Sequence, residues 1–277
     1  MNLRVLGRRL DGLHEIESLV AFAEIGDWLG YEAGRSLELT VEGPTAADAG
    51  PPEKNLVLSA ARALASRVPG LTLGRFRLFK RLPTAAGIGG GSSDAAAALT
   101  ALVEENGLAA EDERVRAAAV ATGADVPVCL FRRATIVSGI GERLGPPVVL
   151  PGVFAVLANP RVPTPTRDVF EALGLLPGSR FQPAHEKTVP KTDEAGISFD
   201  TLISGRNDLE SAALRVAPAI RSTLEELARL PGAKAVRMSG SGATCFALFD
   251  SLLAAAMAQK LAGAERPAWW VKATALR

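Results

Sequence analysis

Apolar and polar residues alternate along several stretches of the first eighty positions, which is the period of a half-buried strand. The alternation and the turn residues between the stretches predict strands at 3–6, 16–24, 36–42 and 71–80. The first two strands bracket a turn at 8–12, which ends in the turn dipeptide Asp11-Gly12. Apolar residues repeat at helical spacing from Asn55 to Val68 and predict a helix there.

The remaining chain continues to mix the two periods. Helices are predicted at 92–105, 111–121, 167–173, 218–229 and 252–262, and strands at 134–137, 147–150, 153–157, 233–238, 244–249 and 269–273. Residues 180–198 are polar and without a period, which predicts a mobile excursion. The order of elements after residue 218 indicates an antiparallel sheet with helices on one face, and a boundary near residue 150 divides the chain into two parts.

The composition is that of an ordinary globular protein, with 48% hydrophobic and 22% charged residues among 277. The net charge of +1 argues against binding of nucleic acid or membranes by bulk charge. Apolar runs are too short to span a membrane, and the N-terminus has no apolar signal region, so we expect a cytoplasmic protein. Two cysteines and two histidines are too few for a disulfide framework, a zinc site built on cysteine or a His-rich metal site.

A glycine- and serine-rich segment, residues 83–93, follows one predicted strand and opens the next helix. Its four glycines permit a tight turn and let backbone N–H groups approach an anion. Ser92 and Ser93 are predicted to cap the helix, whose N-terminal dipole favours phosphate. A phosphate-binding loop is therefore predicted, the alternative being a flexible loop before an ordinary cap. No lysine follows the glycines, which excludes a Walker A loop.

Three further segments combine polar and turn-forming residues. Asp125 follows a helix among small and apolar residues, and is either a base for a substrate hydroxyl or a turn and capping residue. The segment 239–244, SGSGAT, is either a hairpin turn or a second anion-binding wall. The segment 7–15, GRRLDGLHE, is either a solvated hairpin with charged tips or a ligand site, and His14 taken alone is more often a structural histidine than a ligand.

Together these segments resemble the GHMP kinases, a family that includes galactokinase, homoserine kinase and mevalonate kinase. The loop is similar to the phosphate loop of that family, and 239–244 to its C-terminal motif. The chain resembles most closely one branch of this family, which acts on a cytidine diphosphate sugar alcohol on the route to isoprenoid precursors. The resemblance lies in residues 7–19, 26–27, 54–64, 81–99, 121–130, 165–170 and 206–210. The resemblance implies an α+β, two-domain fold, with a ribosomal protein S5 domain 2-like ATP-binding domain at 1–150 and a ferredoxin-like domain at 151–277.

The resemblance also implies ATP- and magnesium-dependent phosphorylation of a tertiary hydroxyl, the 2-hydroxyl, of that small-molecule substrate, with Asp125 as catalytic base. ATP would be held by Lys54, Asn55, Pro83, Ala86, Gly87, Ile88, Gly89, Gly90, Gly91, Ser92 and Ser93, with Ser93 near Mg²⁺. The substrate would be bound by Leu13, His14, Thr166, Phe170, Gly240 and Ser241, of which His14 would hydrogen-bond the cytosine and Phe170 stack on it. No nucleic acid or membrane partner is expected, and the protein would be a monomer or a homodimer.

Two departures from the family pattern stand out. The family begins with an A-K-[IV]-N-L segment before the G-R-R turn, whereas the first lysine here is Lys54 and Asn2 lies two residues too close to Gly7. We expect a start assigned too far downstream, rather than an impaired protein, because every later motif is intact. Leu13 stands where the family usually has tyrosine, so Phe170 would be the remaining aromatic wall.

Two other hypotheses accompany this one. The first is a GHMP kinase for another small alcohol, homoserine- or mevalonate-like. The second is a catalytically impaired nucleotide-binding protein, which the missing lysine motivates.

Overall fold

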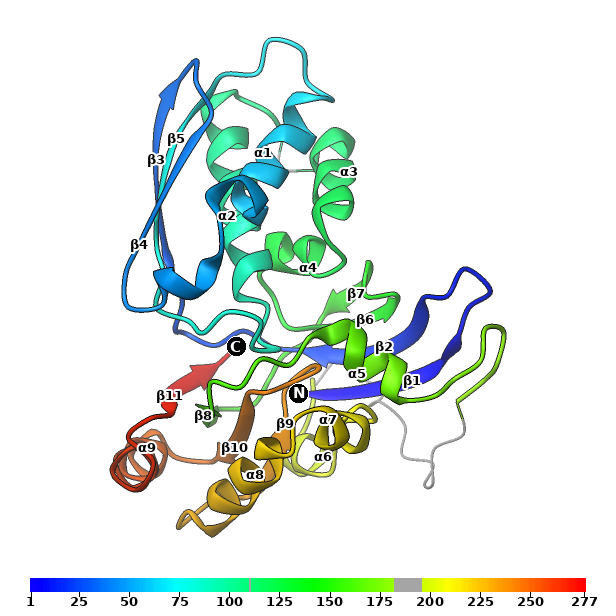
Figure 1. The fold of residues 1–277 in the computed structure, drawn as a ribbon, viewed down its shortest axis with the longest axis vertical. Helices are drawn as coiled ribbons and strands as arrows, with labels where there is room; N and C mark the ends of the chain where they lie inside the picture. The colour runs from blue at the N-terminus through cyan, green and yellow to red at the C-terminus, as the bar shows by residue number, and fades with distance from the viewer. Residues whose placement is uncertain (110, 182–195) are drawn as a thin grey trace. The chain divides into compact units, whose positions relative to one another are not determined.

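The computed structural model describes residues 1–109, 111–181 and 196–277, and their contacts form two units (Figure 1). The first unit comprises Met1–Ile25, Ala85–Ile88 and Arg133–Arg277, and the second comprises Gly26–Thr84 and Gly89–Arg132. The chain therefore passes between units inside the predicted phosphate loop. The boundary near residue 150 stays a prediction about family domains, and these contact units are a different division.

The second unit is built on a three-stranded sheet in the order β3-β5-β4. The strands are β3 (Trp28–Gly34), β4 (Glu38–Glu42) and β5 (Leu73–Phe79). β5 is antiparallel to β3 and parallel to β4. Its buried side chains, Phe76 and Leu78, alternate with exposed ones, as the sequence predicted. β3 was not predicted, because its two glycines and its exposed residues on both faces hide the alternation.

Helices cover one side of this sheet (Figure 1). They are α1 (Leu56–Ala65), α2 (Gly90–Glu105), α3 (Glu113–Thr122) and α4 (Val126–Phe131), and two short 3-10 turns, Ala46–Ala49 and Pro52–Lys54, precede α1. Leu64 of α1 and both Leu99 and Leu102 of α2 are fully buried, so the helices pack through the apolar stripe that predicted them. α4 was missed, because it is only six residues long and has Pro127 in its first turn.

The first unit contains two four-stranded sheets with only antiparallel pairs, in the orders β1-β2-β6-β7 and β11-β8-β10-β9. The strands of one are β1 (Asn2–Arg8), β2 (His14–Val20), β6 (Thr135–Gly139) and β7 (Arg143–Pro147). The strands of the other are β8 (Val153–Asn159), β9 (Ala235–Met238), β10 (Cys245–Phe249) and β11 (Trp270–Leu276). The predicted strand at 147–150 is wrong, because β7 lies earlier in the chain and ends at Pro147.

The helices of the first unit are α5 (Thr166–Ala172), α6 (Phe199–Ile203), α7 (Glu210–Val216), α8 (Ala219–Arg229) and α9 (Leu252–Glu265). α8 and α9 pack directly on the sheet β11-β8-β10-β9, and residues of α5 and α7 belong to the same apolar core. Ile220 and Leu227 of α8 and Phe249 of β10 are fully buried in that core. α6 and α7, of five and seven residues, were not predicted from the sequence.

The remaining predicted elements are confirmed apart from their ends. β2 stops at Val20 rather than at residue 24, and β11 extends to Leu276. Most of the predicted excursion at 180–198, namely 182–195, lies outside the described residues. Within the described part of the chain, no helix is long and apolar enough to cross a membrane.

Candidate active site

The glycine-rich loop leads directly into α2, but not by the cap that the sequence predicted. α2 begins at Gly90, and its cap residue is Gly89, in the left-handed region with φ of 67° and no side-chain cap bond. Ser92 and Ser93 therefore lie inside the first turn, and the prediction that they cap the helix is wrong. Only glycine takes this backbone conformation without strain, so the helix starts two residues early. The free N–H groups of its first turn are thus carried by glycines and Ser92.

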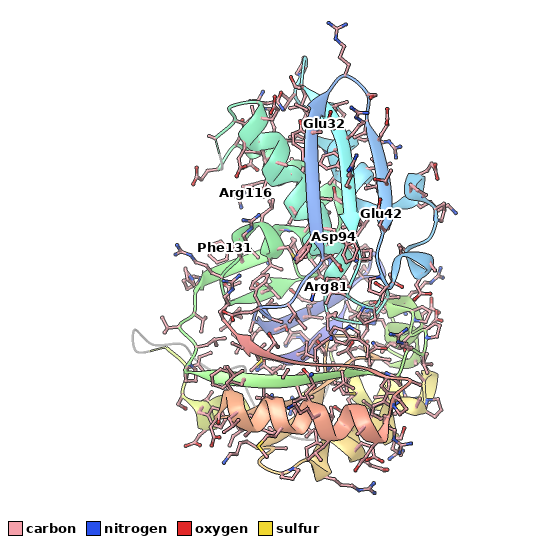
Figure 2. All side chains as sticks on the ribbon, turned by 90° about the vertical axis from the view of Figure 1, so that its left-hand side faces the viewer. Glu32, Glu42, Arg81, Asp94, Arg116 and Phe131 are labelled. Atoms are coloured by element: carbon pink, nitrogen blue, oxygen red, sulfur yellow. The ribbon has the colours of Figure 1, made fainter. Side chains whose placement is uncertain are left out.

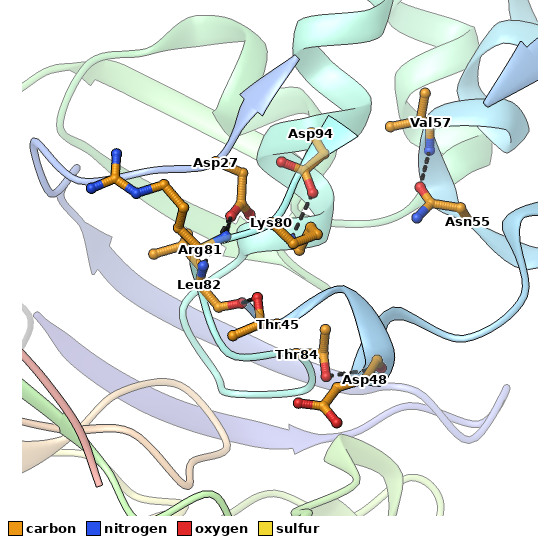
Figure 3. Close-up of polar contacts among 10 residues, drawn as sticks. All are labelled: Asp27, Thr45, Asp48, Asn55, Val57, Lys80, Arg81, Leu82, Thr84 and Asp94. Carbon is orange, nitrogen blue, oxygen red and sulfur yellow. Dashed lines mark hydrogen bonds and ion pairs between the residues drawn. The ribbon is translucent and has the colours of Figure 1, made fainter. Parts of the chain in front are cut away.

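A buried cluster of three charges stands beside this helix start (Figure 3). Lys80, which follows β5, donates from Nζ to Asp27 and, at 2.8 Å, to Oδ2 of Asp94 on α2. Their side chains are almost fully buried, and Figure 2 shows Asp94 among the helices and strands of this unit. The other carboxylate oxygen of Asp27 accepts from the backbone N–H groups of Arg81 and Leu82. The cluster thus ties the strand before the loop to the helix after it.

Burial and charge act in opposite directions on these groups. Burial raises the pKa of Asp94 to about 6, although Lys80 acts to lower it. Burial lowers the pKa of Lys80, but the charge of Asp94 and the hydrogen bonds to both carboxylates raise it more. The lysine therefore stays charged. The sequence analysis did not single out Lys80 or Asp94, and the only signal was a lysine three residues before Pro83 of the loop.

Asp125 stands at the start of α4, but its carboxylate makes no capping bond there. Its side chain is exposed, so a substrate can reach it, while the protein around it partly desolvates the carboxylate and raises its pKa. One turn later, burial and then the charge of Asp125 raise the pKa of the Cys129 thiol to about 12, against a hydrogen bond with Ser93. α2, which carries Ser93, packs against α4, which begins after Asp125, so both residues belong to neighbouring helices of the second unit.

The predicted adenine residues lie at the start of α1. Asn55 caps this helix, because its Oδ1 accepts from Val57 N at 3.0 Å (Figure 3). Lys54 is exposed at the end of the preceding 3-10 turn, and Pro83 lies half-buried at the start of the glycine-rich loop. The Oδ1 of Asn55 thus has a structural role that the resemblance did not imply, and its Nδ2 is the group that could face a base.

In the first unit, the other part of the loop rests on the turn between β9 and β10. Ser239 Oγ donates to Gly87 O at 2.9 Å, and Thr244 N donates to Ala86 O at 3.2 Å. A Cβ atom at Gly87 would lie 2.5 Å from Ser239 O and 2.6 Å from Gly242 O, so only glycine fits there. The two glycine-rich motifs found in the sequence are therefore in direct backbone contact.

The structure also gathers the predicted substrate residues within the first unit. The rings of His14 and Phe170 lie 4.7 Å apart, and Nε2 of His14 is buried without a partner among the described residues. Burial and then the charge of Arg8 lower the pKa of His14, so its imidazole is neutral at neutral pH. Thr166, on the same helix as Phe170, shares a 2.8 Å hydrogen bond with Ser241 Oγ. Leu13 is half-exposed beside His14.

Within the described residues, no group of three or more histidine, cysteine, aspartate or glutamate side chains could hold a metal ion. The exposed Ser93 hydroxyl at the start of α2 is the predicted protein ligand. Mg²⁺ commonly keeps several waters and is held largely by nucleotide phosphates. The site therefore fits an ion that arrives with a nucleotide better than a resident metal.

Comparison with known proteins defines the class. The model for the N-terminal domain of GHMP kinases matches residues 55–133, and the model for their C-terminal domain matches 198–265. A homoserine kinase structure from Cytophaga hutchinsonii has the same fold, with a TM-score of 0.61 at 17% identity over 95% of this chain and 85% of that one. The protein is thus an ATP-dependent phosphotransferase with the GHMP kinase fold.

Similarity over the whole chain identifies one family within the GHMP kinases. The 4-diphosphocytidyl-2-C-methyl-D-erythritol kinase of Xanthobacter autotrophicus is 53% identical over 100% of this chain and 96% of its own, and that of Rhodopseudomonas palustris is 51% identical over 100% and 94%. A crystal structure of 4-(cytidine 5'-diphospho)-2C-methyl-D-erythritol kinase matches with a TM-score of 0.76 at 31% identity, over 99% of this chain and 95% of that one. The chain belongs to the 4-diphosphocytidyl-2-C-methyl-D-erythritol kinase family.

The buried charge cluster predicts a large effect of removing its cation. Lys80→Met would leave the buried carboxylates of Asp27 and Asp94 without their shared cation, and we expect it to lower the free energy of unfolding by about 3–5 kcal/mol. Lys234→Met is the matched control, because Lys234 pairs with Asp250 at the surface, and about 0–1 kcal/mol is expected there. Urea unfolding at neutral pH measures both, and equal effects would contradict a stabilising role for the cluster.

The loop predicts unequal effects at two glycines that both have positive φ, Gly87 at 69° and Gly89 at 67°. Nothing lies within 4 Å of a Cβ at Gly89, so Gly89→Ala should cost only the backbone strain of about 1–2 kcal/mol. Gly87→Ala adds an overlap with the 239–242 backbone and should cost more, with a larger loss of kcat/KM. Thermal unfolding and steady-state assays test this, and equal losses would show that the contact is not tight.

Proposed function

We propose that this protein transfers the γ-phosphoryl group of ATP to the 2-hydroxyl of 4-diphosphocytidyl-2-C-methyl-D-erythritol, a step in the methylerythritol phosphate pathway to isoprenoid precursors. The observation that carries the choice of substrate is that the buried Nε2 of His14, beside Phe170, has no hydrogen-bond partner in the described part of the chain. The names of the relatives, at about half identity over the full chain, support the same substrate. Homoserine- or mevalonate-like substrates have less support.

The proposed recognition of cytosine follows from the chemistry of His14 and Phe170. A neutral imidazole can exchange a hydrogen bond with the edge of a pyrimidine, and the aromatic ring of Phe170 can stack on its face. Leu13 would pack on the other face through apolar contact alone. Thr166 and Ser241 already share a hydrogen bond, so the hydroxyl groups proposed to border the ligand are held in place before it binds.

The transfer itself needs a base and fixed phosphates. In the proposed step, Asp125 accepts the proton of the 2-hydroxyl while that oxygen forms a bond to the γ-phosphorus, and the bond between the γ-phosphorus and its bridging oxygen breaks to release ADP. The raised pKa of Asp125 makes the carboxylate a stronger base than an ordinary aspartate. The loop residues 86–93 would hold the ATP phosphates through backbone N–H groups.

Magnesium fits this arrangement as an ion carried by ATP. Ser93 is the side chain that would approach it, and when bound the ion would neutralise charge on the phosphates. No further protein ligand is proposed. We further propose a cytoplasmic monomer or homodimer with a small-molecule substrate and no nucleic acid partner, in keeping with the net charge of +1.

The first test is the release of ADP from ATP, Mg²⁺ and 4-diphosphocytidyl-2-C-methyl-D-erythritol by the chain as printed. Turnover that depends on this substrate, and that CDP inhibits competitively, is expected. Turnover with homoserine or mevalonate, or a lack of competition by CDP, would overturn the substrate. If the chain binds ATP but does not turn over, and a chain extended at its N-terminus behaves in the same way, the protein would be a nucleotide-binding protein without catalysis.

The base assignment predicts a selective loss in Asp125→Asn. The amide keeps the size of the side chain but cannot accept the proton, so kcat should fall by about 10²–10⁴-fold, while ATP binding measured by calorimetry stays nearly unchanged. Asp112→Asn is the matched control, because Asp112 also stands at a helix start but uses its carboxylate to cap α3. Activity that survives in Asp125→Asn would assign the base elsewhere.

A further inference from the structure

The segment 206–210, RNDLE, resembles the family but has no role in the function proposed above. Asn207 lies in this segment, and its carboxamide faces the turn between β9 and β10. Nδ2 donates to Met238 O at 2.9 Å and to Gly240 O at 2.7 Å, while Oδ1 accepts from Leu209 N at 3.0 Å. A flipped amide would place an oxygen against two carbonyl oxygens, so the orientation is determined by its partners.

Asn207 is itself held from behind by the first strand of the chain. Leu3 N donates to Arg206 O at 2.8 Å, and Asp208 N donates to Leu3 O at 2.9 Å. The carboxylate of Asp208 accepts from Val5 N at 3.0 Å. Backbone bonds on both sides of Asn207 therefore anchor it to β1, so the residue is a rigid support for the turn.

The carbonyl of Gly240 belongs to the peptide group that carries the N–H of Ser241. A trans peptide is planar and points its C=O and N–H in opposite directions. Holding Gly240 O with Asn207 thus directs Ser241 N–H away from the RNDLE segment. Among the residues that the structure describes, the N–H groups of Gly240 and Ser241 donate to no protein acceptor. Together with the positive φ of Gly240, they form a backbone site suited to an anion.

We propose that Asn207 is a positioning residue that orients the N–H of Ser241 toward the diphosphate of the substrate. The inference rests on the proposed function, because Gly240 and Ser241 are proposed there to border that diphosphate. In this proposal Asn207 acts only through its two hydrogen bonds to the turn. The rest of the segment supports the same turn, since Glu210 Oε2 accepts from Met238 N at 3.2 Å.

The test separates recognition of the diphosphate from recognition of the cytosine ring. It compares the affinities of two ligands, CDP and cytidine, in calorimetric titrations or in competition with the substrate. Asn207→Asp keeps the acceptor for Leu209 N but removes both donors to the turn. We expect Asn207→Asp to lower the ratio of CDP affinity to cytidine affinity about tenfold, because one hydrogen bond to a charged group is lost. The affinity for cytidine itself should stay unchanged. KM for the substrate should rise, and KM for ATP should change much less.

The matched control is Asp208→Asn, which alters the neighbouring support on β1 but makes no bond to the turn. Its preference for CDP should equal that of the unaltered chain. If Asp208→Asn and Asn207→Asp reduce the preference equally, Asn207 acts only through stability and the inference is overturned. Asn207→Ala repeats the test without an added charge, and melting temperatures from circular dichroism identify variants that fail to fold.

A measurement on the unaltered chain tests whether the Ser241 N–H binds the diphosphate, even if both Asn207 variants unfold. Hydrogen exchange of the Ser241 amide should be slowed by CDP and not by cytidine, because only the diphosphate would accept from it. Exchange that CDP leaves unchanged would overturn the role of Asn207 while the kinase activity stands. If the chain neither binds CDP nor phosphorylates the diphosphocytidyl substrate, the proposed function fails, and the inference fails with it.

Discussion

The close contact between two glycine-rich backbones is the constraint on which the site depends. Gly87 approaches the turn at 239–242 so closely that a single Cβ would overlap two carbonyl oxygens. Backbone and serine hydroxyl bonds keep that contact in register. Because both segments are proposed to bind phosphates, this one contact relates the proposed ATP loop to the proposed diphosphate site without any charged side chain. Small residues are required for that reason, rather than for flexibility.

The other half of the loop is held by charge instead. Gly89–Ser93 enters α2 beside Lys80 and its two carboxylates, where a cation buried between acids ties the strand before the loop to the helix after it. Such a cluster is a weak source of net stability, since desolvation opposes the attraction. It does specify one arrangement, because displacing Lys80 would leave two buried carboxylates without a cation. The loop is thus held by close packing at one end and by ion pairing at the other.

The structure assigns unequal roles to the residues that the sequence proposed for the site. Asp125 caps nothing and is open to a substrate, which leaves its carboxylate for chemistry. Asn55, proposed near the adenine, already uses Oδ1 as a helix cap. His14, Phe170, Thr166 and Ser241 come from three distant parts of the sequence and meet in one unit. Asn207 supports that group from behind, through bonds that no sequence pattern displays.

Local physics explains what the sequence determined by itself. Apolar periods located α1, α2, α8, α9 and most strands, and glycine density marked both turns, because these signals depend on neighbours in the chain. α4, α6 and α7, each of seven residues or fewer, and β3, which two glycines interrupt, were missed because their apolar residues show no clear period. The Lys80 cluster and the bond from Asn207 to Gly240 were decided only by tertiary structure. Both depend on which distant groups become neighbours, and on the cost of burying a charge or a polar group without a partner.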